Sequence, residues 1–350
     1  MENSQTRGRE RHAGSMKESF ACIDPALPLC WEDPQTLRLG FDRAEARITA
    51  PSAGTQRLLG VLQRGLPLSE LPRASLLVGA TAAERRALIE LVAPVLVTRR
   101  IDDPHGNARG VSRGGSNGGS NGGSSGGSSG GSSGDRREKS AVGTAPVEAR
   151  RLRIAVLGTG GAAESLRSAV GRAGWESLHW SLLPSDALAS DHVSPDLCIV
   201  VERFMEPPAT FHELAASGLP HLAVRFTDRS VRIGPLVIPG RAPCITCLHL
   251  REVAHDPGLP ALAAQLHGRF PAAETPASAE FASALALAYV HRRWDESDWQ
   301  RVTQLRLRVE DGMPSTIPEE HSVLAHPDCA CATASAVPWH VEASTLSQPW

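Results

Sequence analysis

The sequence predicts an α/β protein, a Rossmann-type domain with a small α+β domain before it. An apolar, strand-like run at 152–157 leads directly into a glycine-rich turn and a helical stretch at 162–172, which is how a parallel βαβ unit begins. Strand-like runs at 196–201 and 222–226 then alternate with helical patterns, as in a mainly parallel sheet. Ahead of them, a stretch made almost only of Gly, Ser and Asn, at about 110–134, separates off a shorter first part.

That glycine- and serine-rich stretch sets the predicted domain boundaries. It contains too little apolar surface to offset the entropy of ordering, so we expect a flexible tether. The two parts should then stay near each other but move independently. The predicted division is a disordered or poorly ordered N-terminus (1–34), a small domain (35–100), a linker (101–150), the Rossmann-like domain (151–332) and a tail (333–350).

The pattern of the small domain is winged-helix-like. Alternating apolar residues at 37–41 predict a strand, and residues 46–48 predict its hairpin partner. Apolar residues at helical spacing follow at 52–64, and Thr81–Glu84 forms a capping box that opens another helix. Residues 95–97 predict a last short strand. Two strands, then helices, then a strand is the order of a small winged-helix domain.

Two functions compete for that domain. Winged helices often bind DNA, but the last predicted helix has a mixed charge, from Glu84, Arg85, Arg86 and Glu90, which disfavours DNA. A short sheet with a free edge can instead accept an extended peptide as an added strand, with main-chain hydrogen bonds supplying affinity. We therefore favour peptide recognition, and a plain structural appendage is the remaining alternative.

Composition limits the compartment and the partners expected for the chain. The 350 residues carry a formal net charge of −2, which implies neither a nucleic-acid footprint nor a membrane-surface patch. Residues 1–19 are polar and charged, without the apolar core of a secretory signal. No apolar run approaches the length of a membrane span. We expect a cytoplasmic protein with reduced thiols and with no nucleic-acid or membrane partner.

Four cysteines in two close pairs form a candidate metal site. The pairs are Cys244 with Cys247, and Cys329 with Cys331. Each pair can present two sulfurs to one point from a tight turn, and four thiolates suit a tetrahedral, structural zinc ion. Two disulfides or unrelated buried thiols are the alternatives, which a reducing compartment disfavours. His326 could replace one of the thiolates.

The glycine-rich turn is the second candidate site. Its glycines are Gly158, Gly160 and Gly161. Ala163 stands where a third fingerprint glycine would be, and the next strand is not closed by an acidic residue that would hold a ribose, Asp186 being the nearest candidate. We expect the turn to serve close packing of a helix on a strand, with nucleotide binding as the alternative.

A longer stretch carries a family resemblance. The segment 231–250, which contains the first cysteine pair, resembles actinobacterial ThiF-like proteins of azoline-type ribosomal peptide biosynthesis, together with residues 256–266 and 326–331. Proteins of this family are often labelled as bacteriocin-biosynthesis cyclodehydratase-domain or leader-peptide-binding proteins. The resemblance covers most of residues 151–331, and residues 35–100 match the small peptide-recognition domain of such proteins.

The resemblance implies a partner subunit. Such a ThiF-like chain binds the leader of a precursor peptide and presents its core to a separate, ATP-using YcaO-type cyclodehydratase, which forms thiazolines or oxazolines. It also implies that the four cysteines hold zinc, that the three glycines remain only as a turn, and that this chain itself does not use ATP. An ATP-dependent ThiF-type adenylyltransferase is the leading alternative. A nicotinamide oxidoreductase and a DNA-binding regulator are further ones. We identify no catalytic residue.

Three smaller features leave choices open. The helix with Phe281, Leu285, Ala288 and Tyr289 could form a homodimer contact, as in related proteins, or ordinary core. A basic cluster of Arg225, Arg229 and Arg232 could meet an acidic leader peptide or be a solvated surface. His249 and His255 flank the first cysteine pair and could support the metal ligands, although we favour exposed helix residues.

Overall fold

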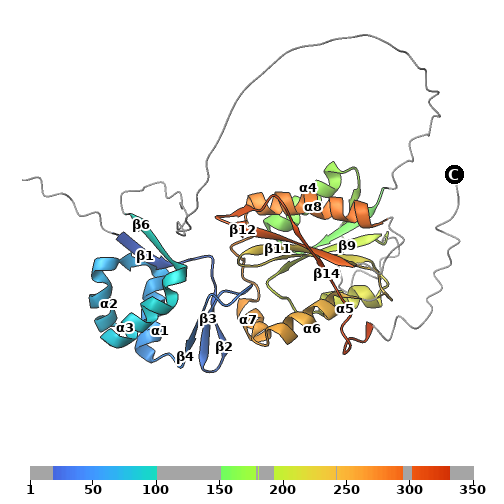
Figure 1. Cartoon of the computed structure of the whole chain (residues 1–350). Coiled ribbons are helices and arrows are strands. Elements are labelled where there is room, and N and C mark those ends of the chain that lie inside the picture. The colour runs from blue at the N-terminus through green and yellow to red at the C-terminus, as the bar shows by residue number, and fades with distance from the viewer. Residues whose placement is uncertain are drawn as a thin grey trace, which may run out of the picture.

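The computed structural model describes residues 19–100, 151–178, 180, 193–241, 243–294 and 302–331, without the side chains of Arg99 and Arg100. The predicted linker (101–150), the tail (333–350) and Asp186 lie outside these residues. The described chain forms two lobes that lie side by side (Figure 1). The smaller lobe holds residues 19–100 and the larger lobe holds residues 151–331.

The smaller lobe combines six short strands with three helices. Its elements are β1 (Ser19–Ile23), β2 (Leu29–Asp33), β3 (Thr36–Leu39), β4 (Ala46–Thr49), α1 (Ala53–Arg64), β5 (Leu66–Pro67), α2 (Leu71–Leu77), α3 (Ala82–Val92) and β6 (Leu96–Arg100), with single 3-10 turns at Leu68–Glu70 and Ala93–Val95. They form two three-stranded sheets, in the orders β5-β1-β6 and β2-β3-β4. The winged-helix interpretation stays a prediction.

The expectation of a poorly ordered segment through residue 34 is wrong for residues 19–34. Strand β1 pairs antiparallel with β6 along its whole length and with β5 on its other side. Its residues Ala21 and Ile23 are buried, and β2 pairs with β3. Burial of these side chains, together with ladder hydrogen bonds, offsets the entropy of ordering the segment.

Local signals in the rest of this lobe are confirmed. Strands β3 and β4 pair antiparallel with Leu37 opposite Ile48, as the alternating pattern predicted. Ser52 caps α1 by accepting a hydrogen bond from the Thr55 amide. The capping box is complete, because the Thr81 side chain accepts from the Glu84 amide and the Glu84 carboxylate accepts from the Thr81 amide.

The larger lobe is a mixed sheet between helices. Its elements are β7 (Arg153–Leu157), α4 (Gly161–Arg172), β8 (Glu176–Leu178), β9 (Leu197–Arg203), α5 (Ala209–Ala216), β10 (His221–Phe226), β11 (Ser230–Val237), α6 (Ile245–His255), α7 (Leu259–Leu266), α8 (Pro276–Trp294), β12 (Thr303–Glu310), β13 (Met313–Pro314) and β14 (Glu319–Ser322). The strand order is β13-β12-β11-β10-β9-β7-β8, with β14 also paired to β12. Pairing is parallel from β8 to β10 and antiparallel from β10 to β12.

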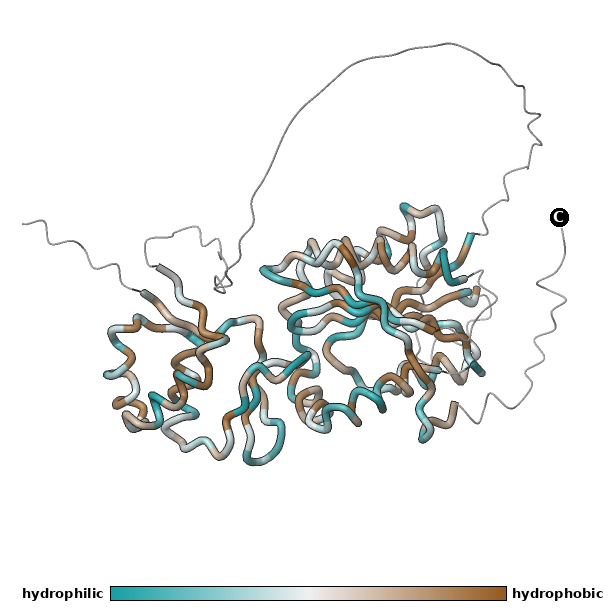
Figure 2. The backbone as a smooth tube through the Cα atoms, in the orientation of Figure 1, coloured by the Kyte–Doolittle hydropathy of each residue, from teal (hydrophilic) through white to brown (hydrophobic). Residues whose placement is uncertain are grey.

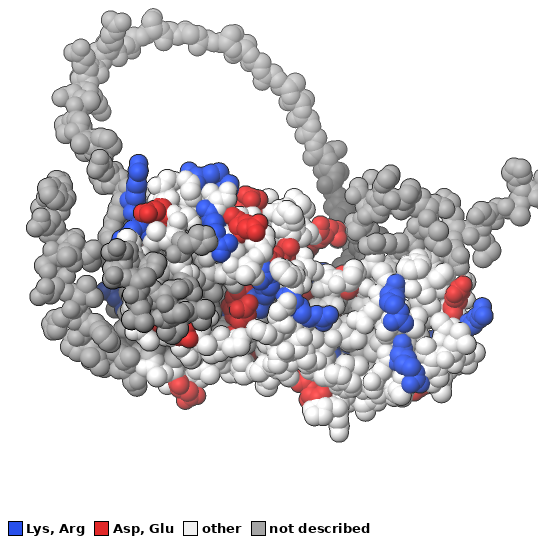
Figure 3. Space-filling view, turned by 180° about the vertical axis from the view of Figure 1, so that it is seen from behind, with Lys and Arg blue, Asp and Glu red and all other residues white. Residues whose placement is uncertain are grey.

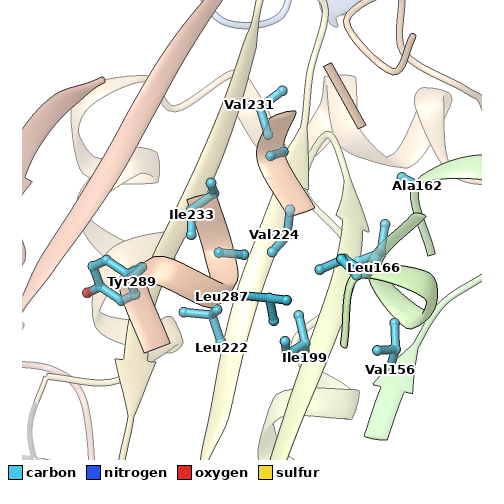
Figure 4. Close-up of a cluster of buried hydrophobic side chains, with 14 of the residues drawn as sticks. Val156, Ala162, Leu166, Ile199, Leu222, Val224, Val231, Ile233, Leu287 and Tyr289 are labelled. Atoms are coloured by element: carbon cyan, nitrogen blue, oxygen red, sulfur yellow. The ribbon is translucent and has the colours of Figure 1, made fainter. Parts of the chain in front are cut away.

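Apolar side chains fill both faces of this sheet. On one face, strand residues such as Ile199 and Val224 meet Leu166 of α4 and Leu287 of α8 (Figure 4). On the other face, a smaller cluster joins the strands to α5 and to the start of α6. Hydrophobic stretches of backbone occur in both lobes, and in the larger lobe several of them lie in the sheet (Figure 2). Within the described residues, no helix has both the length and the hydrophobicity needed to cross a bilayer.

Helix α8 lies mainly in this core. It packs against α4 and β11, and buried Tyr289 donates a hydrogen bond from its hydroxyl to the Thr303 carbonyl. The four residues singled out on this helix do not share one buried face, because Phe281 is 38% exposed and Ala288 is also exposed. Tyr289 is therefore a core residue, and a homodimer through α8 stays a prediction.

The two lobes pack against each other, which differs from the expectation that they move independently. Phe41 of the smaller lobe shares an apolar cluster with Phe204 and with Leu262 of α7. The Gln265 side chain of α7 accepts from the Trp31 amide and donates to the Trp31 carbonyl. A flexible linker permits independent motion of the lobes but does not require it. The burial of apolar and ionic groups between the lobes favours one relative orientation.

Candidate metal centre and peptide-binding edge

The structure brings the four predicted cysteines to one point. Their sulfurs all lie within 4.8 Å of one another, and the closest separations are 3.2 Å for Cys247 with Cys331 and 3.6 Å for Cys244 with Cys329. Zn–S bonds of about 2.3 Å in a tetrahedron place neighbouring sulfurs about 3.8 Å apart. The observed separations bracket that value, so the donor set fits a single ion such as zinc. The ligand group found among the described residues does not include His326.

Two local structures position the sulfurs. Cys244 is the residue before α6 and Cys247 lies in its first turn, so both sulfurs point to the same helix end. The second pair sits on a turn in which the Cys329 amide donates to the His326 carbonyl. Arg251 of α6 also holds the segment before that turn, by donating to two of its carbonyls. Nothing in the sequence pattern singled out this arginine.

The cluster suits a structural role. All seven cysteines of the chain are free thiols in the structure. Burial raises the pKa of Cys329 to about 11 and also raises the pKa of Cys331, whereas hydrogen bonds outweigh burial at Cys247 and lower its pKa. A bound cation would stabilise the thiolates that burial disfavours. Four protein ligands complete a tetrahedral site, so the chemistry such an ion would supply is cross-linking rather than activation of a substrate.

In the glycine-rich turn, Gly160 lies next to two side chains of the same chain, whereas Gly158, Thr159 and Gly161 are exposed. Gly158 and Gly160 have positive φ angles of 124° and 80°, which only glycine adopts without strain. Arg203 donates to the carbonyl of Thr159, and a β-carbon at Gly160 would lie 3.0 Å from both the Arg203 guanidinium and the Phe270 ring. Close packing therefore requires glycine at Gly158 and Gly160, whereas a β-carbon at Gly161 would have no neighbour within 4 Å.

An ion pair lies beside Gly160. The Arg203 guanidinium forms a two-pronged ion pair with Glu274, at 2.6 and 2.8 Å, and the Phe270 ring stacks on its outer side. The open positions at Gly158 and Gly161 leave nucleotide binding at Gly158, Gly160 and Gly161 as an alternative.

The predicted basic cluster is instead an internal ion-pair network. Arg225 is buried on β10 between two carboxylates, with Nε 2.8 Å from Glu202 and Nη1 2.7 Å from Glu252. Arg232 also binds Glu252, and Arg229 binds Asp24 of the smaller lobe. The proposal of a patch for an acidic peptide is therefore wrong for these arginines. On the face shown in Figure 3, charges of both signs are interspersed on a largely uncharged surface.

His249 belongs to the same network and is not the exposed helix residue that was favoured. It is buried, its Nε2 accepts from the Arg225 guanidinium, and the same nitrogen lies 3.5 Å from Glu202. Burial alone would raise the pKa of Glu202, but the Arg225 guanidinium more than offsets this and holds it at about 2. Glu202 thus remains ionised inside the sheet.

Two aspartates extend the network across the joint between the lobes. Asp42 of the smaller lobe accepts from Thr227, Ser230 and Arg232 of the larger lobe. Burial would raise the pKa of Asp42, but Arg232 and the two hydroxyls lower it. Asp228 in turn accepts from the backbone amides of Phe41 and Asp42, while burial and the nearby Asp42 charge raise its pKa to about 6.

The sheet β2-β3-β4 has one covered edge and one open edge. The β2 edge is covered by Gln265 at Trp31, and β2 packs against α7. Strand β4 ends the sheet on the other side, where it pairs with β3 alone among the described residues and lies near α3. The sequence predicted a free edge without indicating which strand supplies it.

The register identifies the unpaired groups on β4. The Ala50 amide bonds to the Gln35 carbonyl, and the ladder then places Ile48 opposite Leu37. Hydrogen-bonded pairs alternate along an antiparallel ladder, so Ile48 pairs with β3 while Arg47 and Thr49 direct their backbone N–H and C=O groups outward. The Arg47 side chain binds Glu32 on β2 at 2.7 Å.

Comparisons with known proteins give structural likeness only. No family model and no curated protein matches the sequence. The chain is similar to the heterocyclase TruD (16% identity, TM-score 0.38), over 90% of this chain and 43% of that one. It is similar to a heterocyclase in complex with substrate and cofactor (12%, 0.36), over 87% and 38%, and to the E. coli microcin synthetase McbBCD complex (11%, 0.39), over 89% and 100%. This chain thus spans less than half the length of the first two.

Proposed function

We propose that this chain is a leader-peptide-binding subunit. It holds a ribosomal precursor peptide as an added strand on β4 and presents the core of that peptide to a separate, ATP-using YcaO-type cyclodehydratase in the cytoplasm. That partner forms the thiazoline or oxazoline rings. The open edge of β4, in a sheet of the smaller lobe that packs against the larger lobe, is the observation that carries the proposal.

The chemistry of an edge strand supports this role. The outward N–H and C=O groups at Arg47 and Thr49 can pair with an extended peptide, and alternate side chains of that peptide then supply specificity. Tethering the leader raises the effective concentration of the core at the partner to about the mM range for a short flexible connection. The chain contributes to the reaction in this way without a reacting group of its own.

The other polar groups of the described lobes have internal roles in this proposal. The cysteines cross-link α6 to the segment before Cys331, the arginines of β10 and β11 are neutralised by buried carboxylates, and Arg203 lies beside Gly160 of the glycine-rich turn. An ATP-dependent adenylyltransferase is the alternative function. It would be revealed by exchange of pyrophosphate into ATP.

Replacing Arg47 with proline should weaken peptide binding by about tenfold, because proline removes one outward N–H and its ring obstructs the edge. A fluorescently labelled precursor peptide is the probe, and anisotropy of the full chain with that peptide is the measurement.

Arg47→Ala is the matched control. It removes the same side chain, including its contact with Glu32, but keeps the backbone donor. We expect Arg47→Ala to bind within about threefold of the unaltered chain, since an exposed ion pair contributes little. Equal losses in both variants, or no loss in Arg47→Pro, would show that the peptide does not pair with β4.

A further inference from the structure

Helix α6 contacts the cysteine cluster at its first turn and the smaller lobe at its other end. Cys244 and Cys247 fix the first turn beside Cys329 and Cys331. Later in the helix, Arg251 donates to the carbonyls of Leu324 and Ala325. Helix α6 is therefore tied to the last described segment of the chain by the sulfur group at its first turn and by Arg251 beyond its midpoint.

The far end of α6 holds an arginine of the smaller lobe. Asp256 follows the helix directly, and its carboxylate lies 2.6 Å from the Arg38 guanidinium of β3. The Arg38 side chain is 0% exposed, and its remaining nitrogens donate to the carbonyls of Gly40 and Phe41. Without Asp256, Arg38 would be left as a buried cation with neutral partners only, which is strongly unfavourable.

Glu252 of α6 supplies a second carboxylate that is linked to residues 38–42 of the smaller lobe. Glu252 lies one helical turn before Asp256 and binds Arg232, whose other terminal nitrogen lies 3.0 Å from Asp42. Residues four apart occupy one face of a helix. The helix therefore directs both carboxylates toward residues 38–42 of the smaller lobe, one directly and one through Arg232.

We propose that α6 acts as a strut, meaning a helix that couples the metal centre to residues 38–42 of the smaller lobe. Metal binding at the four cysteines fixes the helix, and the helix fixes the turn at 38–42 through its positioning residues Glu252 and Asp256. Docking of the smaller lobe strengthens metal binding by the same factor, because such coupling is reciprocal. This inference does not depend on the peptide-binding function.

Hydrogen exchange of the full chain tests the coupling without any peptide. Zinc-loaded protein is compared with protein stripped by a chelator under reducing conditions. We expect amides of residues 36–42 to lose protection by at least about tenfold on stripping, together with those of α6, because local opening exposes them. Protection in β9 (Leu197–Arg203) should remain. Unchanged protection at 36–42, or equal loss in β9, overturns the proposal.

The variant Asp256→Asn tests the same link with the metal in place. Protection at 36–42 should fall by at least about tenfold while zinc content stays the same. Stripping the metal from Asp256→Asn should then cause a much smaller further loss at 36–42 than in the unaltered chain, because coupled contacts are not additive. If the losses of protection from metal removal and from Asp256→Asn are fully additive, the proposed coupling through α6 is wrong. His255→Gln, at an exposed position of the same helix, is the control and should match the unaltered chain.

Discussion

Replacing Arg225 with leucine will lower the free energy of unfolding by about 3–5 kcal/mol, because removing one partner of a buried ion pair leaves an uncompensated charge. Glu202 is fully buried and is paired with Arg225 at 2.8 Å, and Glu252 shares the same guanidinium. Leucine fills part of the volume but supplies no donor to either carboxylate. Urea denaturation at neutral pH, followed by circular dichroism, measures the loss.

Arg172→Leu is the matched control for that substitution. It removes the same kind of side chain from an ion pair with Glu280 in which both partners are well exposed. We expect a change of less than about 1 kcal/mol, because solvent-exposed pairs contribute little to stability. Similar losses in the two variants would mean that the Arg225 network does not contribute as a buried charge cluster.

The loss in Arg225→Leu should also depend on pH. In the unaltered chain, the pKa of Glu202 is held at about 2, below its ordinary value of 4.5. Its ionisation therefore contributes stability that is present above the ordinary value and lost as the pH falls through the native value. Without Arg225, burial favours the protonated acid. The difference in unfolding free energy between the variant and the unaltered chain should therefore shrink below about pH 4. A difference that grows toward acid pH would contradict this assignment.

Replacing Cys247 with serine will remove stoichiometric zinc from the purified, reduced chain. We expect a loss of at least about 3 kcal/mol and a fall in the unfolding temperature of roughly 10 °C, because metal-binding energy at a structural site is folding energy. Cys247 is buried in the first turn of α6 and lies 3.2 Å from Cys331. Elemental analysis and thermal unfolding provide the two measurements.

Cys22→Ser is the control for the thiol substitution. Cys22 lies half-buried on β1 and is not among the clustered sulfurs. This variant should keep about one zinc ion per chain and unfold within a few degrees of the unaltered protein. If the chain lacks zinc before any substitution, or if Cys22→Ser loses it equally, the four-cysteine site is not a zinc centre.

Short-range patterns predicted many elements of the fold. The capping box at Thr81–Glu84, the β3–β4 hairpin, the strand and turn at 152–161 and the cysteine group all formed as expected. Each is determined by residues close in sequence or, for the cysteines, by a residue type with few other uses. Strand β1 could not be found in this way, because its partners are distant in sequence: β5 follows α1, and β6 follows α3.

The internal charges were the main feature that sequence patterns could not reveal. Arg225, Arg229 and Arg232 looked like a basic surface because the carboxylates that neutralise them come from β9, α6 and the smaller lobe. Burial of Arg38 depends on Asp256 in the same way. An ion pair between distant segments has no local pattern, so the joint between the lobes emerges only in the folded chain.

The placement of the sheet β2-β3-β4 would affect the distance between a bound peptide segment and a protein on the larger lobe. Its strands contact helices of their own lobe on one side and α7 of the larger lobe on the other. A sheet held on both sides cannot rotate relative to the larger lobe. The distance from a peptide segment bound to this sheet to any protein bound on the larger lobe would therefore be constant. A molecular ruler of this kind selects residues by their distance along the substrate, and inserting spacer residues would shift which of them is reached.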